Sequence, residues 1–421
     1  MNPSIAPLRT TTLLCAVEVL SMTATMAYPT LLTVLLAEWG LSNSSAGLIG
    51  GSFFGGYMLA VPVLTSLTDR IDARRIYFFA TLLAAAGTAG FGWLAEGVAT
   101  AVLFQAIAGM GLAGTYMPGL RILSDRIDTR RHSRYIAFYT SSFGIGTSLS
   151  ILLAGWIAEA LGWRDTFVLL GIGPLVAGVL VLLGTDARRP EPAPGGHGPL
   201  LDIRGVLANR SARSYILAYA AHCWELFGLR SWMVAFLAFS ASLHAATGRP
   251  FLSAAAAAAA INLLGPLASI FGNEFAATYG RRRTIARVMW ASAAMGAVIG
   301  FTAPLPWLVV FLLMVAYFLL VMGESAALTA GLIAVAAPGR RGATMAVHSL
   351  LGFGAGFAAP LAFGIMLDLF GGAERTAAWG MAFVSLALGA AVGPLALAWQ
   401  RRTARRRPRG KPGTRRARGT S

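Results

Sequence analysis

Apolar stretches recur twelve times along this chain, and short polar gaps separate them. Most are long enough to cross a hydrocarbon core about 30 Å thick as an α-helix. The predicted spans are residues 12–37, 45–67, 76–95, 99–124, 134–158, 165–184, 214–240, 251–276, 284–303, 306–335, 342–368 and 376–399.

Positive charge falls in every second gap between these spans. Of the 34 Lys and Arg residues, 29 lie on one side, counting alternate gaps, the first residues of the spans that follow them and both ends of the chain. The other side holds only Arg164, Arg249 and Arg375, while Arg121 and Arg230 lie inside spans. Basic residues stay on the cytoplasmic face of a membrane protein. The pattern therefore predicts an all-α membrane protein with twelve transmembrane helices and both termini in the cytoplasm.

Composition agrees with a membrane protein. The chain is 56% hydrophobic and 12% charged, whereas a soluble domain carries roughly 25% charged residues. The net charge of +17 lies mostly in short loops and in residues 401–421, which carry ten basic residues. No base-reading module accompanies this charge, so we expect no nucleic-acid binding. We expect the basic tail to be disordered and to lie on anionic lipid headgroups.

The longest hydrophilic interval divides the chain near its middle. Residues 185–213 are rich in proline, glycine and arginine, with six spans before them and six after. This order predicts an N-terminal six-helix bundle over residues 1–184, a cytoplasmic linker over 185–213, a C-terminal six-helix bundle over 214–400 and the tail over 401–421.

A nine-residue string occurs twice on the predicted cytoplasmic face. LTDRIDARR at Leu67–Arg75 and LSDRIDTRR at Leu123–Arg131 are identical at seven of nine positions. The orientation rule accounts for the arginines but not for the acids, which contribute little to orientation. We expect ion pairs there that latch the cytoplasmic helix ends. The predicted gating residues are Asp69, Arg70, Asp72, Arg74, Arg75, Asp125, Arg126, Asp128, Arg130 and Arg131.

These motifs resemble those of the major facilitator superfamily of secondary transporters, over residues 12–400. The family pattern Gly-x-Leu-Ala-Asp-Arg-x-Gly-Arg-Arg after helix 2 is matched by Leu67, Asp69, Arg70, Arg74 and Arg75, with Thr65 and Asp72 at the glycine positions. Its weaker second copy is matched by Gly280, Arg281 and Arg282, with Ala277 in place of the acid. The Trp-Arg-x-x-Phe start of helix 6 is matched by Trp163, Arg164 and Phe167.

The resemblance implies the fold of that family, a bacterial inner-membrane location, a monomer and no cofactor. It also implies a central cavity lined by helices 1, 4, 7 and 10. Two departures count against drug-efflux antiport. Gln105 stands four residues before Gly109 where such antiporters often carry arginine, and the fifth span contains no Gly-Pro pair.

Ionisable residues inside spans are the candidates for substrate binding or ion coupling, because a charge in lipid is costly. Glu225 lies near the predicted midplane, and His222 shares its helix face, whereas Arg230 points away. The candidate set is Glu18, Gln105, Arg121, His222, Glu225, Arg230, Glu324 and His348.

A buried glutamate without a cation takes up a proton, and an arginine can hold an anionic group through its planar fork. The alternative is static pairing, with Glu225 held by a neighbouring Arg or His and Arg121 held by Asp125. A single His222/Glu225 pair is a weak metal signal, so we expect no metal site. No nucleotide-binding loop or catalytic motif is present, so we expect no enzyme activity.

The sequence therefore predicts a secondary transporter that moves a small solute by alternating access, coupled to protons, with a small organic anion as the favoured substrate. Two alternatives stay open: an efflux antiporter for lipophilic or cationic compounds, and a non-transporting membrane sensor with the same fold.

Overall fold

The computed structural model describes residues 5–126, 132–188, 203–244, 250–337 and 340–405. These ranges are built of α-helices and one short 3-10 helix, and they contain no strand. The elements are α1 Ile5–Ser21, α2 Ala27–Trp39, α3 Asn43–Leu67, α4 Ala73–Leu94, α5 Val98–Ala113, α6 Tyr116–Ser124, α7 His132–Leu170, α8 Ile172–Gly184, α9 Ile203–Ala208, α10 Arg210–Ser242, α11 Ala254–Leu263, α12 Gly265–Tyr279, α13 Arg281–Ile299, η3 Gly300–Thr302, α14 Trp307–Gly323, α15 Ser325–Val335, α16 Arg341–Leu369 and α17 Thr376–Arg405.

Nine segments of the described chain are long and apolar enough to cross a membrane. The longest, Arg134–Gly184, contains two helical runs that meet at Gly162, whose φ of 83° ends the first. The α1–α2 pair and α10 lie outside this set of nine but correspond to the first and seventh predicted spans. The predicted all-α fold of twelve membrane helices is thereby confirmed.

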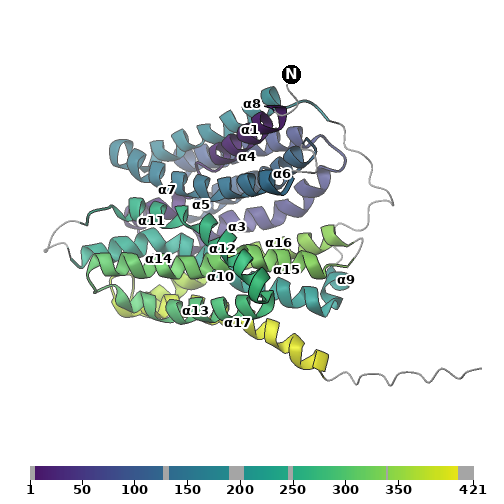
Figure 1. Ribbon diagram of the computed structural model, residues 1–421. Helices are drawn as coiled ribbons and strands as arrows, with labels where there is room; N and C mark the ends of the chain where they lie inside the picture. The colour runs from purple at the N-terminus through teal and green to yellow at the C-terminus, as the bar shows by residue number, and fades with distance from the viewer. Residues whose placement is uncertain (1–4, 127–131, 189–202, 245–249, 338–339, 406–421) are drawn as a thin grey trace, which may run out of the picture.

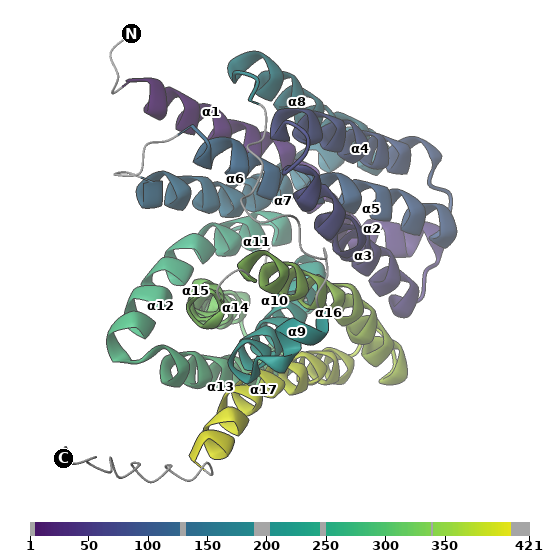
Figure 2. The ribbon, with the colours of Figure 1, turned by 90° about the vertical axis from the view of Figure 1, so that its right-hand side faces the viewer.

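The helices form two groups. Figure 1 shows α1–α8, in purple to blue, above α10–α17, in teal to yellow. The start of α1, the end of α17 and the short helix α9 lie at the right-hand end of the bundle, and Figure 2 views the two groups from that end. We call it the linker end, because Thr185–Arg188 and α9 flank the interval between the two groups. The opposite end is the far end.

Several membrane segments are broken near their middle. Residues 22–26 interrupt the first segment between α1 and α2, and Gly114 and Thr115 separate α5 from α6. Glu324 lies between α14 and α15 and carries backbone φ and ψ of −96° and −14°. Broken helices are tolerated in membranes where the freed backbone groups face protein or a cavity rather than lipid. The breaks therefore mark the interior of the bundle.

Contacts between the two groups extend from the far end to the middle of the bundle. Helix α3 packs on α16, from Asn43 beside Asp368 to Tyr57, whose ring stacks on Phe353 at 3.8 Å. Helix α7 meets α11 and α12 in the same way, with Gly155 against Ala255 and Gly144 against Pro266. The two groups are therefore closed against each other at the far end.

Glycines make the α3–α16 contact possible. A Cβ on Gly47 would lie 2.2 Å from the Pro360 carbonyl oxygen, and one on Gly51 would lie 2.3 Å from that of Phe357. Small residues at this spacing let membrane helices approach to backbone contact. The Gly47–Gly51–Gly55 stripe thus forms the seam between the two halves.

Candidate functional site

Three glutamates are buried inside the helix bundle. Glu18 lies on α1, Glu225 lies on α10, and Glu324 lies at the α14–α15 break. Their exposed fractions are 0%, 0% and 1%. Among the described residues, neither Glu18 nor Glu225 has an arginine or lysine within ion-pair distance, and Glu324 has only a histidine. A buried carboxyl group without a permanent cation is stable only when hydrogen-bonded or protonated.

Glu225 is held by two hydroxyl groups from other helices. Its Oε1 lies 3.0 Å from the Tyr317 hydroxyl of α14, and its Oε2 lies 2.9 Å from the Ser292 hydroxyl of α13. The Ser292 hydroxyl is also 3.0 Å from the Met289 carbonyl oxygen. A hydroxyl group carries a single proton and cannot donate to both acceptors fully.

Protonation resolves this conflict at Glu225. A proton on Oε2 would donate to Ser292, which would then donate to Met289, while Tyr317 donates to Oε1. Every donor and acceptor in the set is then satisfied. The geometry is thus suited to a carboxyl group that binds and releases a proton.

Glu324 and two histidines form a second group beside Glu225. His222 Nδ1 lies 3.3 Å from Glu324 Oε1, and the His348 ring stacks on Tyr219 at 3.6 Å. Glu324 Oε2 and His348 Nδ1 have no hydrogen-bond partner among the described residues. Buried polar groups without partners are rare and often mark sites where a ligand or proton acts.

Arg230 does not pair with Glu225. Its Nε donates to the Asn262 side-chain oxygen at 3.0 Å, and its guanidinium lies over the Phe318 ring, 5.6 Å from the centroid. Asn262 in turn donates to the Ala258 carbonyl oxygen at 2.9 Å. The proposed static pairing of Glu225 with a neighbouring arginine is therefore absent from this structure.

Glu18 has a similar environment in the other half. The Tyr139 hydroxyl lies 2.8 Å from Glu18 Oε2 and 3.1 Å from the Tyr116 carbonyl oxygen, so one proton again serves two acceptors. Glu18 Oε1 is buried and has no partner in the described part of the chain. A protonated Glu18 would donate to Tyr139 and free it to bond Tyr116.

The last two candidates lie on the fourth membrane segment. Gln105 is buried on α5, with an exposed fraction of 6%. Arg121 lies on α6 and pairs with Asp125 at 3.0 Å and with Asp69 at 3.5 Å. Arg121 is thus bound within the linker-end loops, as the static alternative for this residue describes.

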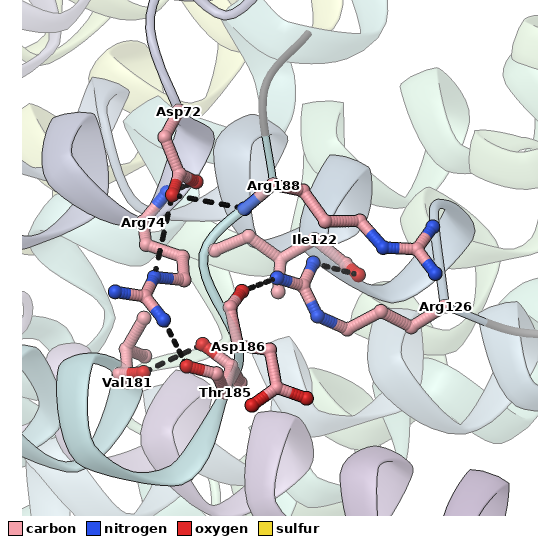
Figure 3. Close-up of polar contacts among 8 residues, drawn as sticks. All are labelled: Asp72, Arg74, Ile122, Arg126, Val181, Thr185, Asp186 and Arg188. Atoms are coloured by element: carbon pink, nitrogen blue, oxygen red, sulfur yellow. Dashed lines mark hydrogen bonds and ion pairs between the residues drawn. The ribbon is translucent and has the colours of Figure 1, made fainter.

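The repeated acidic and basic loops bind the start of the linker. Asp72 caps α4 by accepting from the Arg74 N–H at 3.0 Å, and it accepts from the Arg188 N–H at 3.2 Å. Arg74 donates to the Thr185 carbonyl oxygen and Arg126 to that of Asp186, as Figure 3 shows.

The same residues make further bonds: Arg126 donates to the Ile122 carbonyl oxygen and Arg188 to that of Asp125. Burial lowers the pKa of the Arg126 guanidinium, and the nearby positive charges of Arg188 and Arg74 lower it further. The negative charges of Asp72 and Asp125 raise this pKa in part.

The contacts that the predicted gating residues make here are thus with their own half and with the start of the linker. Arg70 and Arg75 are exposed, and Asp128, Arg130 and Arg131 lie outside the described residues.

Sequence reasoning missed the partners of the buried acids. Tyr317, Ser292, Asn262 and Tyr139 are hydroxyl or amide residues on other helices, 32 to 121 residues away from the acid or arginine that they bind. Their polarity inside apolar spans was the one available signal, but spacing along the chain does not identify which acid each one meets.

Comparisons with known proteins concern the family and the fold. A family model described as Major Facilitator Superfamily matches residues 13–351. An uncharacterized MFS-type transporter, YcaD, from Salmonella arizonae is 29% identical over 180 residues, and the YcaD of Salmonella typhimurium matches equally. That alignment covers 42% of this chain and 47% of the relative, so the chain spans about half the length of the curated relatives it matches.

Two solved structures share the fold. A bacterial homologue of the human lysosomal transporter Spinster, inward-facing and unoccupied, superimposes with a TM-score of 0.73 at 17% identity, covering 96% of this chain and 98% of that one. The nucleoside transporter NupG gives a TM-score of 0.73 at 14% identity, covering 93% and 99%.

Proposed function

This chain belongs to the major facilitator superfamily, and we propose that it moves a small solute across a membrane by alternating access, driven by protons that bind its buried glutamates. Family membership indicates a transporter rather than an enzyme. The observation that carries proton coupling is the set of buried carboxyl groups, each without an arginine or lysine partner in the described residues and two of them held by shared hydroxyl protons.

The contacts between the halves support alternating access. The α3–α16 and α7–α11 seams close the far end. We place the arginine-rich linker end in the cytoplasm by the positive-inside rule. With the far end closed, this conformation then corresponds to the inward-facing stage of the cycle. The membrane that we propose is the inner membrane of a bacterial cell. The other stage requires the halves to rock about their middle.

Proton coupling fits the chemistry of the C-terminal half. Glu225 and Glu324 lie in the same cluster, because Glu324 contacts His222, three residues before Glu225 on α10, and directly follows α14, whose Tyr317 binds Glu225. Two negative charges in a dry interior repel strongly, so uptake of one proton stabilises the pair. A solute that changes the hydration or the contacts of this pair would change its proton occupancy, which is the link that coupling needs.

The interior charges favour a neutral or cationic solute over the organic anion that the composition alone suggested. The two arginines of the predicted spans are already bound by oxygen acceptors, Arg230 in the interior by Asn262 and Arg121 at the linker end by Asp125 and Asp69. The three buried glutamates have no arginine or lysine partner in the described residues, so the interior accommodates an added positive group better than an added negative one. The second candidate substrate, a lipophilic or cationic compound, is therefore favoured over the organic anion.

Counterflow in proteoliposomes tests transport and coupling together. The probes are radiolabelled tetraphenylphosphonium, a nucleoside and a small carboxylate. We expect Glu225→Gln to reduce proton-driven accumulation at least tenfold and to keep counterflow within about twofold, because an amide has no exchangeable charge. Exposed Glu274→Gln is the matched control.

The outcomes separate the functions. A protein that shows no counterflow with any probe, while binding one of them, is a sensor rather than a transporter. Accumulation that survives Glu225→Gln removes this residue from the coupling step.

A further inference from the structure

One carboxylate joins the two halves at the far end. Asp368 Oδ1 accepts from the Asn43 N–H at 3.0 Å and from the Asn43 side-chain amide at 2.8 Å. Asp368 Oδ2 accepts from the Ser44 N–H at 2.8 Å and from the Ser44 hydroxyl. Four donors of α3 thus converge on a single side chain of α16, 324 and 325 residues away in the sequence.

The position of Asp368 on its own helix is unfavourable. It lies in the last turn of α16, where unpaired carbonyl groups give the helix end a partial negative charge. An acid there is destabilising unless another group compensates. The compensation comes from the N-terminus of α3, which carries the opposite partial charge.

The first turn of α3 depends on both halves for its hydrogen bonds. Ser42, the N-cap, accepts from the Ser45 N–H with its side chain and from the Ala46 N–H with its carbonyl oxygen. The two N–H groups before them, those of Asn43 and Ser44, bond to Asp368. A helix leaves its first N–H groups without internal partners, and here the other half supplies the missing acceptor.

The backbones are in close contact at the same place. A Cβ on Gly364 would lie 2.1 Å from the Asn43 carbonyl oxygen. The two helix ends approach this closely because position 364, one turn of α16 before Asp368, carries no side chain. The carboxylate therefore reaches the α3 N-terminus only when the far end is closed.

We propose that Asp368 is the positioning residue that holds the far end closed, acting as an interdomain cap on α3 that breaks and re-forms once in each transport cycle. The inference rests on the alternating access of the proposed function. The contact is reversible because Asp368, Asn43 and Ser44 lie at the bundle end and Asp368 is exposed. Water can replace Asp368 on the two N–H groups when the halves separate.

Distances between spin labels in lipid nanodiscs test this proposal without substrate or protons. One pair, Glu96→Cys with Glu374→Cys, reports the far end, and a second pair, Ile71→Cys with Gly342→Cys, reports the linker end. Both are made in a background carrying Cys15→Ser and Cys223→Ser. All four labelled positions are exposed.

We expect Asp368→Ala to raise the ratio of far-end-open to far-end-closed molecules about tenfold, the shift that loss of a charge-assisted cap contact supports. The linker-end distance should shorten in the same molecules. Asp368→Asn should fall between wild type and Asp368→Ala, because an amide keeps one oxygen acceptor and loses the charge. Asp165→Ala, which removes an exposed acid elsewhere, is the matched control and should leave both distances unchanged.

The paired distances separate a latch from general damage. A protein that is only destabilised has a lower melting temperature and broader distributions of both label distances. Loss of the interdomain cap instead lengthens the far-end distance and shortens the linker-end distance. Unchanged far-end distances in Asp368→Ala would overturn the proposal. That result would leave proton coupling at Glu225 untouched, because neither label pair depends on protonation.

Discussion

Tyr317, Ser292 and Tyr139 determine which protonation states the buried acids can adopt. Each lies 2.8 to 3.0 Å from a carboxyl oxygen, and Ser292 and Tyr139 also reach a backbone carbonyl. Such hydroxyls can donate to a carboxylate or accept from a carboxylic acid without moving. The same hydroxyl groups can therefore bind both the charged and the protonated form of each acid.

Asn262→Ala tests how Arg230, the buried arginine of α10, is stabilised. Removing the amide oxygen leaves a guanidinium N–H without its acceptor, so we expect a loss of about 1–3 kcal/mol in the free energy of unfolding. Denaturant titration in detergent measures it. The double variant Arg230→Met, Asn262→Ala should lose less than the sum of the single losses, with a coupling of roughly 1 kcal/mol. Strict additivity would show that the pair does not interact.

At the scale of elements, glycines let neighbouring helices pack with their backbones in contact. Gly56 of α3 lies against Ala106 of α5, and Gly109 of α5 lies against Phe53 of α3, where an added Cβ would be 2.0 and 1.8 Å from a carbonyl oxygen. The same helix α3 meets α16 through Gly47 and Gly51 on another face. Helix α3 is thus fixed within its own half and forms the seam with the other.

Gly109→Ala should be strongly destabilising for this reason. The added methyl group forces α3 and α5 apart, and overpacking of this kind costs about 1–3 kcal/mol. The melting temperature of the purified protein reports the loss. Gly342→Ala is the matched control, since no atom lies within 4 Å of its added Cβ. Equal melting temperatures for the two variants would contradict the close contact.

Membrane helices were predictable at this scale, whereas their partners were not. Hydropathy runs placed the span that became α10 within a few residues of Arg210–Ser242, because lipid selects long apolar helices. The site was predicted in part: Glu225, Glu18 and Glu324 stood out as acids in apolar runs. Their hydroxyl donors come from helices that meet only in the folded bundle, and the acceptor role of Asp368 appears only when α3 lies beside it.

At the scale of the whole molecule, contacts at both ends of the bundle hold the described segments together in this conformation. At the far end, Asp368 joins the halves directly. At the linker end, Asp72, Arg74 and Arg126 bind residues 185–188, so the linker begins as a fixed part of the N-terminal half. When the halves rock, we expect residues 185–188 to move together with the N-terminal half.

Arg126→Gln tests the attachment of the linker. Loss of the guanidinium removes the bond to the Asp186 carbonyl oxygen, so we expect amide hydrogen exchange across residues 185–188 to speed up by about tenfold. Arg75→Gln, which alters an exposed arginine nearby, is the comparison and should leave exchange unchanged. Identical exchange in both variants would mean that the loops do not hold the linker.

Proton movement during solute flux addresses the central claim most directly. The purified wild-type protein is reconstituted in weakly buffered vesicles that contain a pH-sensitive dye, and a gradient of the transported solute is imposed with the membrane potential clamped. We expect the internal pH to change as solute crosses, with Glu225→Gln abolishing the change. Solute flux with a constant internal pH would contradict proton coupling.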